Sequence, residues 1–418
     1  MLRRPLIGTT ICVLAVVVAS ACSSSSGTGA GSGTSTSSGT GAGASSGASG
    51  PFVIAGVLPL TGAFGAVGTT LLAGMNGQAA LLNKQGGILG RQIQINIKDS
   101  ASDTQQAVSA MRDVLSDPSG VDAVVAEATG SLNAAVMPIV APTKIISVTS
   151  SVAPCTSSTC FSFGTTSKDT AAASLQAIKS LHLTKVGIIG GTDASGQSEA
   201  QELTALASKY GLSVVGTELF DPNGKDYTAQ LQKLRAAGAQ VLTGNLKGTP
   251  IGVLGNGLAN IGWADVKVVG DVGWGSSPLS TLIPKSVQPQ VMWAGALGAT
   301  RIDGKLTASQ QQFIQAIKDT HSQLLSLTSS GVGADMVTGL KYAFDKAGKI
   351  DQAAAVQAME GMKNDPSAAS LPWRFFVGQG PRYSASVHDS SNIDLATMFA
   401  LDVISNPVEG TYEGTKIS

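Results

Sequence analysis

The sequence holds few of the side chains on which metal and redox chemistry depend, because its 418 residues include only three histidines and four cysteines. Basic and acidic residues are equal in number, 27 of each, and no basic block occurs, which argues against a nucleic-acid partner. No internal stretch approaches the roughly 18 consecutive apolar residues of a membrane-spanning helix. These absences exclude a polytopic membrane protein, and we expect no metal, no cofactor and no catalytic cluster.

The first 50 residues are typical of an exported, anchored protein rather than of a folded domain. Residues 1–22 combine two arginines, a short apolar run and small residues, which is the layout of a secretory signal. Ala19-Ser20-Ala21-Cys22 resembles a bacterial lipobox, so we expect Cys22 to carry a lipid on the outer face of the cytoplasmic membrane. An ordinary signal peptide cleaved nearby is the alternative. Residues 23–50 are almost entirely Ser, Gly, Thr and Ala and predict a disordered tether.

Two cysteines remain beyond this segment, Cys155 and Cys160, separated by Thr-Ser-Ser-Thr. An oxidising exterior favours a small disulfide loop between them. A redox pair would instead show the C-x-x-C spacing, which is absent here. We therefore predict a structural disulfide.

Strand and helix patterns alternate twice along the rest of the chain. The predicted strands are residues 52–58, 92–97, 123–126 and 145–149, and then 185–189, 212–220, 240–243, 266–270 and 291–296. Segments with helical spacing lie between them, and further helices are predicted at residues 309–324, 334–347 and 351–359. This alternation predicts two similar α/β lobes, each with a parallel sheet covered by helices.

The loops that follow the predicted strands are rich in Gly, Ser, Thr and Asn and carry few charges. Ligands of open parallel sheets bind beyond the carboxyl ends of the strands. Hydroxyls and backbone N–H groups at helix starts suit a carboxylate or another small polar group. For any single one of these residues, an ordinary helix cap or turn residue is the alternative.

Three stretches near the start of the first lobe are more specific. They are Leu58-Pro-Leu-Thr-Gly62 followed by Gly65 and Gly68, Leu82-Asn-Lys-Gln-Gly-Gly-Ile-Leu-Gly-Arg91, and Asp99-Ser-Ala-Ser-Asp103 leading into Gln105-Gln-Ala-Val108. In this order and spacing the chain resembles the branched-chain amino-acid binding proteins, which are type I solute-binding proteins of ABC transporters.

The resemblance implies two Rossmann-like lobes with parallel-rich sheets, joined by a three-stranded hinge. Lobe 1 is expected at residues 51–167 plus 299–392, and lobe 2 at 168–298 plus 393–410, with 411–418 as a C-terminal tail. The crossovers are expected near residues 166–168, 297–300 and 392–394.

The resemblance also implies where a ligand binds. The loop after the third strand holds the ligand carboxylate in this family, which points to Thr129, Gly130 and Ser131. The next loop contributes Ser150 and Ser151.

In the second lobe, Asp271 is the match for the acid that binds a ligand ammonium, with a helix cap as the equal alternative. Aromatic residues common in leucine-type binders are replaced here by Val67, Ser195 and Asn245, which leaves the ligand class open. Phe64 and Trp274 lie on predicted cleft loops and are candidates to stack on a ligand.

The predicted function is that of a lipid-anchored, monomeric solute receptor that closes around an amino acid or a related small carboxylate or amide and delivers it to an ABC permease. A sensing module for a membrane partner is the alternative, because the same fold serves both roles. An exported hydrolase is a distant third. It would need a nucleophile–base pair or a metal cluster, and His182, His321 and His388 lie in no such spacing.

Overall fold

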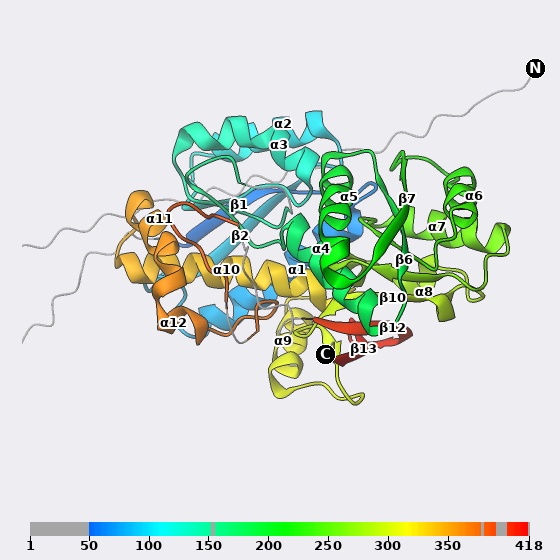
Figure 1. The fold of residues 1–418 in the computed structure, drawn as a ribbon. Helices are drawn as coiled ribbons and strands as arrows, with labels where there is room; N and C mark the ends of the chain where they lie inside the picture. Colours follow the sequence, from blue (N-terminus) through cyan, green and yellow to red (C-terminus); the bar gives the residue numbers. More distant parts are fainter. Residues whose placement is uncertain (1–49, 152–154, 378–379, 390–398, 417–418) are drawn as a thin grey trace, which may run out of the picture. The chain divides into compact units, whose positions relative to one another are not determined.

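The computed structural model describes residues 50–151, 155–377, 380–389 and 399–416 (Figure 1). The predicted signal, Cys22 and nearly all of the predicted tether lie outside these residues, as does the crossover expected near residues 392–394. Within the described ranges, no helix is both long enough and apolar enough to cross a membrane.

A five-stranded parallel sheet forms the first half of the fold, in the order β2-β1-β3-β4-β5. Its strands are β1 (Phe52–Leu58), β2 (Ile93–Asp99), β3 (Ala123–Val125), β4 (Ser147–Thr149) and β5 (Cys160–Ser162). The helices between them are α1 (Gly65–Asn83), α2 (Thr104–Leu115) and α3 (Gly130–Val140).

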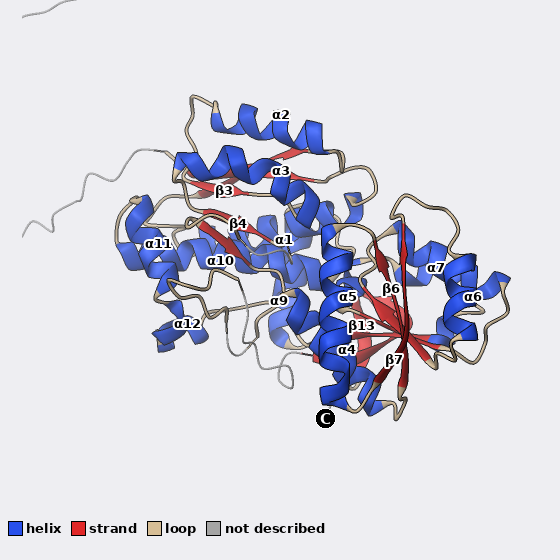
Figure 2. Ribbon diagram, turned by 45° about the horizontal axis from the view of Figure 1, so that its top comes forward, coloured by secondary structure: helices blue, strands red, loops and turns tan. Residues whose placement is uncertain are grey.

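Helices cover both faces of this sheet, which is why β1 is an unbroken apolar run. Phe52 and Ile54 share a core with residues of α1 and of α10 (Leu327–Ala347), whereas Val53 and Ala55 share one with residues of α2 and α3. Figure 2 shows α2 and α3 on one side of the strands and α10 on the other.

A second sheet has eight strands in the order β11-β13-β12-β10-β9-β8-β6-β7. These strands are β6 (Lys185–Gly191), β7 (Ser213–Phe220), β8 (Val241–Gly244), β9 (Lys267–Gly270), β10 (Val291–Ala296), β11 (Thr300–Arg301), β12 (Phe399–Val408) and β13 (Thr411–Lys416). Strands β6 to β10 pair in parallel, and β12 runs antiparallel to both β10 and β13. Its helices are α4 (Ser167–Ser180), α5 (Ala194–Leu206), α6 (Thr228–Ala236), α7 (Thr249–Asn260) and α8 (Leu279–Leu282). The two parallel-rich sheets confirm the predicted α/β class.

The chain returns to the first sheet through a block of helices, α9 (Ala308–Asp319), α10, α11 (Gln352–Glu360) and α12 (Pro366–Ala369). Helix α10 lies directly on α1, because glycines remove the side chains at their contact. A Cβ atom on Gly74 would stand 1.9 Å from the carbonyl oxygen of Ser330, and one on Gly333 would stand 2.2 Å from that of Leu71. The two backbones therefore touch where α1 also borders the site described below.

Two details of the chain's course differ from the sequence prediction. Residues 411–416, predicted as part of a tail, form β13 instead, because a turn at Glu409-Gly410 with φ of 54° and 70° folds them back against β12. Strand β11 pairs with β13, so the second sheet extends past the crossover expected at residues 297–300.

The predicted disulfide is present. Cys155 and Cys160 are joined, with their Cα atoms 5.6 Å apart. Cys160 is also the first residue of β5, so the bridge closes a short loop directly against the edge strand of the first sheet.

A buried carboxyl group lies inside the second sheet at Asp402 on β12, which is 3% exposed. The hydroxyl of Thr300 donates to its two oxygens at 2.9 and 3.0 Å. Glycines on both neighbouring strands leave room for it, since a Cβ on Gly295 or Gly414 would fall 1.9 or 2.1 Å from the carboxylate oxygens. Burial raises the pKa of Asp402 to about 8, so this group is mostly protonated at neutral pH.

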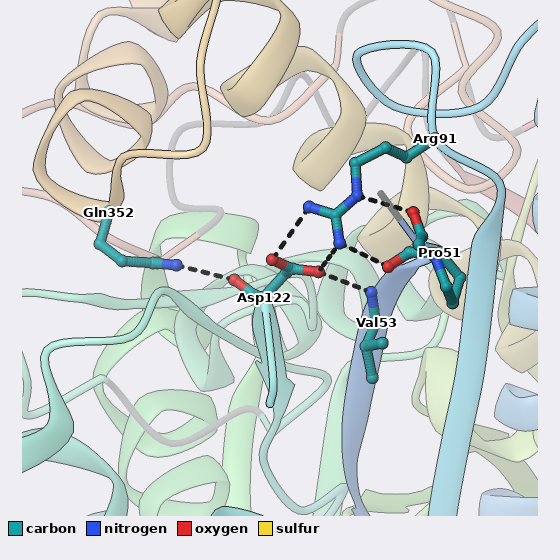
Figure 3. Close-up of polar contacts among 6 residues, drawn as sticks. Pro51, Val53, Arg91, Asp122 and Gln352 are labelled. Atoms are coloured by element: carbon teal, nitrogen blue, oxygen red, sulfur yellow. Dashed lines mark hydrogen bonds and ion pairs between the residues drawn. The ribbon is translucent and has the colours of Figure 1, made fainter. Parts of the chain in front are cut away.

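The start of the fold is held by Arg91 and Asp122 (Figure 3). The guanidinium of Arg91 donates to the Asp122 carboxylate at 3.0 and 3.3 Å and to the carbonyl oxygens of Gly50 and Pro51. The same carboxylate accepts the N–H of Val53 at 2.8 Å. The long motif that ends at Arg91 thus fixes the first residues of β1.

Candidate functional site

Two adjacent cavities lie where loops of both sheets meet, and they share one lining residue, Lys247. The larger cavity has a volume of about 70 Å³ and the smaller one about 30 Å³. One water molecule needs about 10–15 Å³ by this measure, so together the cavities suit a small solute.

The larger cavity combines an apolar wall with hydroxyls and two charges. Its apolar residues include Val67 and Leu71 of α1, Val332 of α10, and Phe375. Its hydroxyls come from Ser150, Thr165, Thr170, Ser276, Thr328 and Ser329, and its charged residues are Asp271 and Lys247. This lining suits a ligand with an apolar body and a few polar groups.

The smaller cavity is polar and lies at the starts of helices. Helix α3 begins there, preceded by Thr129, whose side chain makes no capping bond and whose hydroxyl is buried without a partner. Helix α5 begins there as well, and Asp193 caps it by accepting the N–H of Gly196 at 2.8 Å. The free N–H groups at the start of α3 favour an anionic group in this cavity.

Behind the cavities lies a pair of buried acids, Glu199 on α5 and Asp271 after β9. The Asn245 amide bridges them, donating at 3.0 Å to Glu199 and at 2.8 Å to Asp271. The Thr170 hydroxyl also donates to Glu199, at 3.1 Å. Burial raises the pKa of both acids, and the charge of Asp271 raises that of Glu199 further, while Lys247 lowers both. Of the two acids, Glu199 is the one whose pKa lies well above its ordinary value, because it is buried beside the charge of Asp271.

A third buried acid, Glu127, lies in the short connection between β3 and α3. Its carboxylate accepts the N–H of Ala128 at 3.1 Å, and its carbonyl oxygen accepts the hydroxyl of Thr149. Burial raises its pKa to about 7. These bonds tie the carboxyl ends of β3 and β4 together below the cavities.

The structure brings together eight of the ten residues predicted to bind ligand. The smaller cavity is lined by Phe64, Thr129, Gly130, Ser131, Ser195 and Asn245, and the larger one by Ser150 and Asp271. Asp271 lies directly before the short 3₁₀ helix at Val272–Ser276, and the backbone N–H of Gly273 in that helix lowers its pKa, so the helix-cap role stays an alternative.

Two predicted residues, Ser151 and Trp274, line neither cavity. Ser151 is buried, and its carbonyl oxygen accepts the hydroxyl of Ser162 at 2.6 Å. The Trp274 ring is 1% exposed and lies over Gly270, where a Cβ atom would stand 2.2 Å from the indole. The prediction that Trp274 stacks on a ligand is therefore corrected, because the ring belongs to the core of the second sheet.

Sequence reasoning missed Lys247, Glu199 and Phe375. Lys247 had a signal, since it is the one charged residue in the predicted loop after β8. Glu199 lies inside a helix, and Phe375 comes from a segment far along the chain, so the sequence carried no signal for either residue.

The histidines lie away from both cavities. His182 and His321 were expected within helices but follow the ends of α4 and α9 with φ of 58° and 55°. The ring of His388 stacks on Phe161 and lies 3.1 Å from the Glu360 carboxylate. No group of three His, Cys, Asp or Glu side chains among the described residues is arranged to hold a metal ion.

Comparison with known proteins identifies the family. Residues 51–382 match the family model described as periplasmic binding protein. The Leu/Ile/Val-binding protein homolog 3 of Brucella melitensis is 26% identical over 318 residues, which cover 75% of this chain and 83% of that relative.

Solved structures share the fold. A type 1 periplasmic binding protein from Bordetella pertussis superposes with a TM-score of 0.73 at 19% identity, covering 88% of this chain and 100% of the other. An ABC-transporter solute-binding protein from Rhodopseudomonas palustris in complex with benzoate gives a TM-score of 0.66 at 14% identity, covering 88% and 96%. The chain belongs to the periplasmic binding proteins and is a type I solute-binding protein of the branched-chain amino-acid-binding kind.

Proposed function

We propose that this protein captures a small solute, either an amino acid or a related small carboxylate or amide, and delivers it to an ABC permease. The observation that carries the proposal is the pair of adjacent cavities, lined from both sheets by groups at strand ends and helix starts. The ligand is held by Thr129, Gly130, Ser131 and Ser150 from one side and by Asp271 from the other, without covalent chemistry.

The proposal includes closure of two lobes around the solute. The sequence predicts these lobes at residues 51–167 plus 299–392 and at 168–298 plus 393–410. We move the boundaries to 51–167 plus 302–392 and to 168–301 plus 393–416, because β11 and β13 both belong to the second sheet. Hinge closure of this kind buries the ligand and presents one closed form to a membrane partner. The protein acts as a monomer outside the cytoplasm, anchored by lipid on Cys22.

Support for the ligand class comes from two comparisons. The Brucella relative is named for leucine, isoleucine and valine, and the Rhodopseudomonas neighbour holds benzoate. Both kinds of ligand pair a carboxylate with an apolar body, which agrees with the mixed lining of the cavities.

The test is a thermal-shift screen of the protein lacking residues 1–22 against amino acids, amides, aromatic acids and polyols. A ligand at about a hundredfold over its Kd adds roughly 2.7 kcal/mol to the free energy of unfolding, which raises the melting temperature visibly. Uptake of the identified solute is then measured in cells with and without the gene. Binding with unchanged uptake would favour the sensing alternative, and ester or amide turnover would refute the binding-protein role.

A further inference from the structure

The position of Lys247 indicates that the ligand carries an anionic group, which membership of the family does not by itself imply. Among the described residues that line the two cavities, Lys247 is the only cation, and it borders both of them. Its side chain is partly buried, and its ammonium has no carboxylate within 4.0 Å among the described residues. A partly buried cation in a cleft, with no carboxylate in direct contact, favours an anionic ligand group.

The opposite wall of the smaller cavity supplies the complement to this cation. Helix α3 starts there with no side-chain cap, and the Thr129 hydroxyl, 8% exposed, has no hydrogen-bond partner among the residues that the structure describes. The cavity volume of about 30 Å³ accommodates a group the size of two water molecules, which is the size of a carboxylate. One carboxylate there contacts Lys247 from the second sheet's side and the start of α3 from the first.

The charges around Asp271 decide whether the ligand also needs an amine. Lys247 already lies beside Asp271, since a Cβ atom on Gly273 would stand 3.0 Å from an Asp271 carboxylate oxygen and 3.3 Å from Cε of Lys247. A ligand ammonium near Asp271 would therefore place a second cation beside Lys247. The attraction to Asp271 is then offset by repulsion from Lys247.

We propose that Lys247 is a specificity-determining residue that binds the ligand's carboxylate together with the start of α3, and that the ligand is a small carboxylic acid without an α-ammonium group. Its apolar body occupies the larger cavity beside Val67, Leu71 and Phe375. This inference rests on the proposed function, since it names the ligand class of the same site.

The experiment is isothermal calorimetry with matched probes. One set is 4-methylpentanoate, its amide and leucine, and the other is 3-phenylpropanoate, its amide and phenylalanine. In the wild type, at least one acid should bind ten- to a hundredfold tighter than its amide, as expected for a hydrogen bond to a charged group. The same acid should bind at least as tightly as the corresponding amino acid. Lys247→Met should abolish the acid-over-amide preference, and Lys247→Arg should retain most of it.

The exposed Lys285→Met serves as the matched control and should leave all affinities unchanged. A purely structural role for Lys247 would weaken acid and amide alike. If Lys247→Met fails to fold, the wild-type preference and the Lys247→Arg variant still test the proposal. An amino acid that binds more than tenfold tighter than its acid would overturn it, as would failure of both acids to bind.

Identification of the native solute tests this inference separately from the proposed function. It is released by denaturing protein purified from its own cells and identified by mass spectrometry. A bound acid without an amine supports both claims. A bound amino acid, amide or polyol refutes the role given to Lys247 but keeps solute capture, whereas an empty protein that also binds nothing in the wider screen refutes both.

Discussion

The buried carboxyl of Asp402 makes a quantitative prediction about stability. In the folded protein its pKa is raised by burial from 3.8 to about 8, so the native state keeps a proton that the unfolded chain releases. Stability is therefore greatest at low pH and falls as the pH rises from about 4 to about 8. Between pH 5 and pH 8 this one group should lower the free energy of unfolding by about 4 kcal/mol.

The variant Asp402→Asn removes this dependence, because the amide has nearly the same shape but does not ionise. It fits between Gly295 and Gly414 and can still accept the Thr300 hydroxyl. Near pH 5 the variant should be more stable by no more than about 2 kcal/mol. At pH 8 this advantage should reach about 5 kcal/mol.

Urea unfolding of wild type and variant at several values from pH 5 to pH 8 measures this difference. The exposed Asp265→Asn is the control and should follow the wild type. Equal pH dependence in wild type and Asp402→Asn would refute the reasoning. A variant that lacks the pH dependence but is less stable than the wild type throughout this range would show instead that the Thr300 contacts need the carboxyl group itself.

Three further predictions concern the site and the helices beside it. Glu199→Gln should change the affinity for the best probe at pH 7 by less than about threefold, because burial beside Asp271 raises the pKa of Glu199 and so favours the neutral form that the amide resembles; a larger loss in calorimetry would contradict this expectation. Thr129→Val should raise the unfolding free energy by about 1 kcal/mol by removing a buried, unpartnered hydroxyl, and should weaken ligand binding; stabilisation without weaker binding would exclude Thr129 from the site. Gly74→Ala should cost about 1–3 kcal/mol in urea unfolding because of the Ser330 carbonyl, whereas Gly361→Ala, with its nearest contact at 3.4 Å, should be tolerated.

The alternation of apolar strands and helices predicted most of the fold, because each strand is covered on both faces and so reads as a short apolar run. Phe52–Leu58 is the clearest example. The antiparallel pairing of β12 with β13 was not predictable in this way. It depends on a turn at Glu409-Gly410 and on a carboxyl buried at Asp402, and neither follows from periodicity.

The candidate site was predictable where it lies directly after a strand, as at Thr129 and Asp271. It was not predictable where a side chain reaches the cavities from elsewhere. Phe375 comes from a segment held by Asp335, whose carboxylate accepts the N–H groups of Phe375 and Phe376 at 2.9 and 3.0 Å. Trp274 is the opposite case, a residue that was predicted to line the cleft but lies in the core. Its ring packs there because Gly270 leaves space for it.

The ion pair between Arg91 and Asp122 affects how the folded part of the chain resists a pulling force. Residue 50 enters the fold at β1, a central strand flanked by β2 and β3, and the guanidinium holds the carbonyl groups just ahead of it. A pull on the chain from its N-terminal side loads two parallel strand pairs in shear, together with an ion pair, instead of peeling away an edge strand one bond at a time. Tension applied at residue 50 is thus resisted without opening the sheet whose loops line the candidate site.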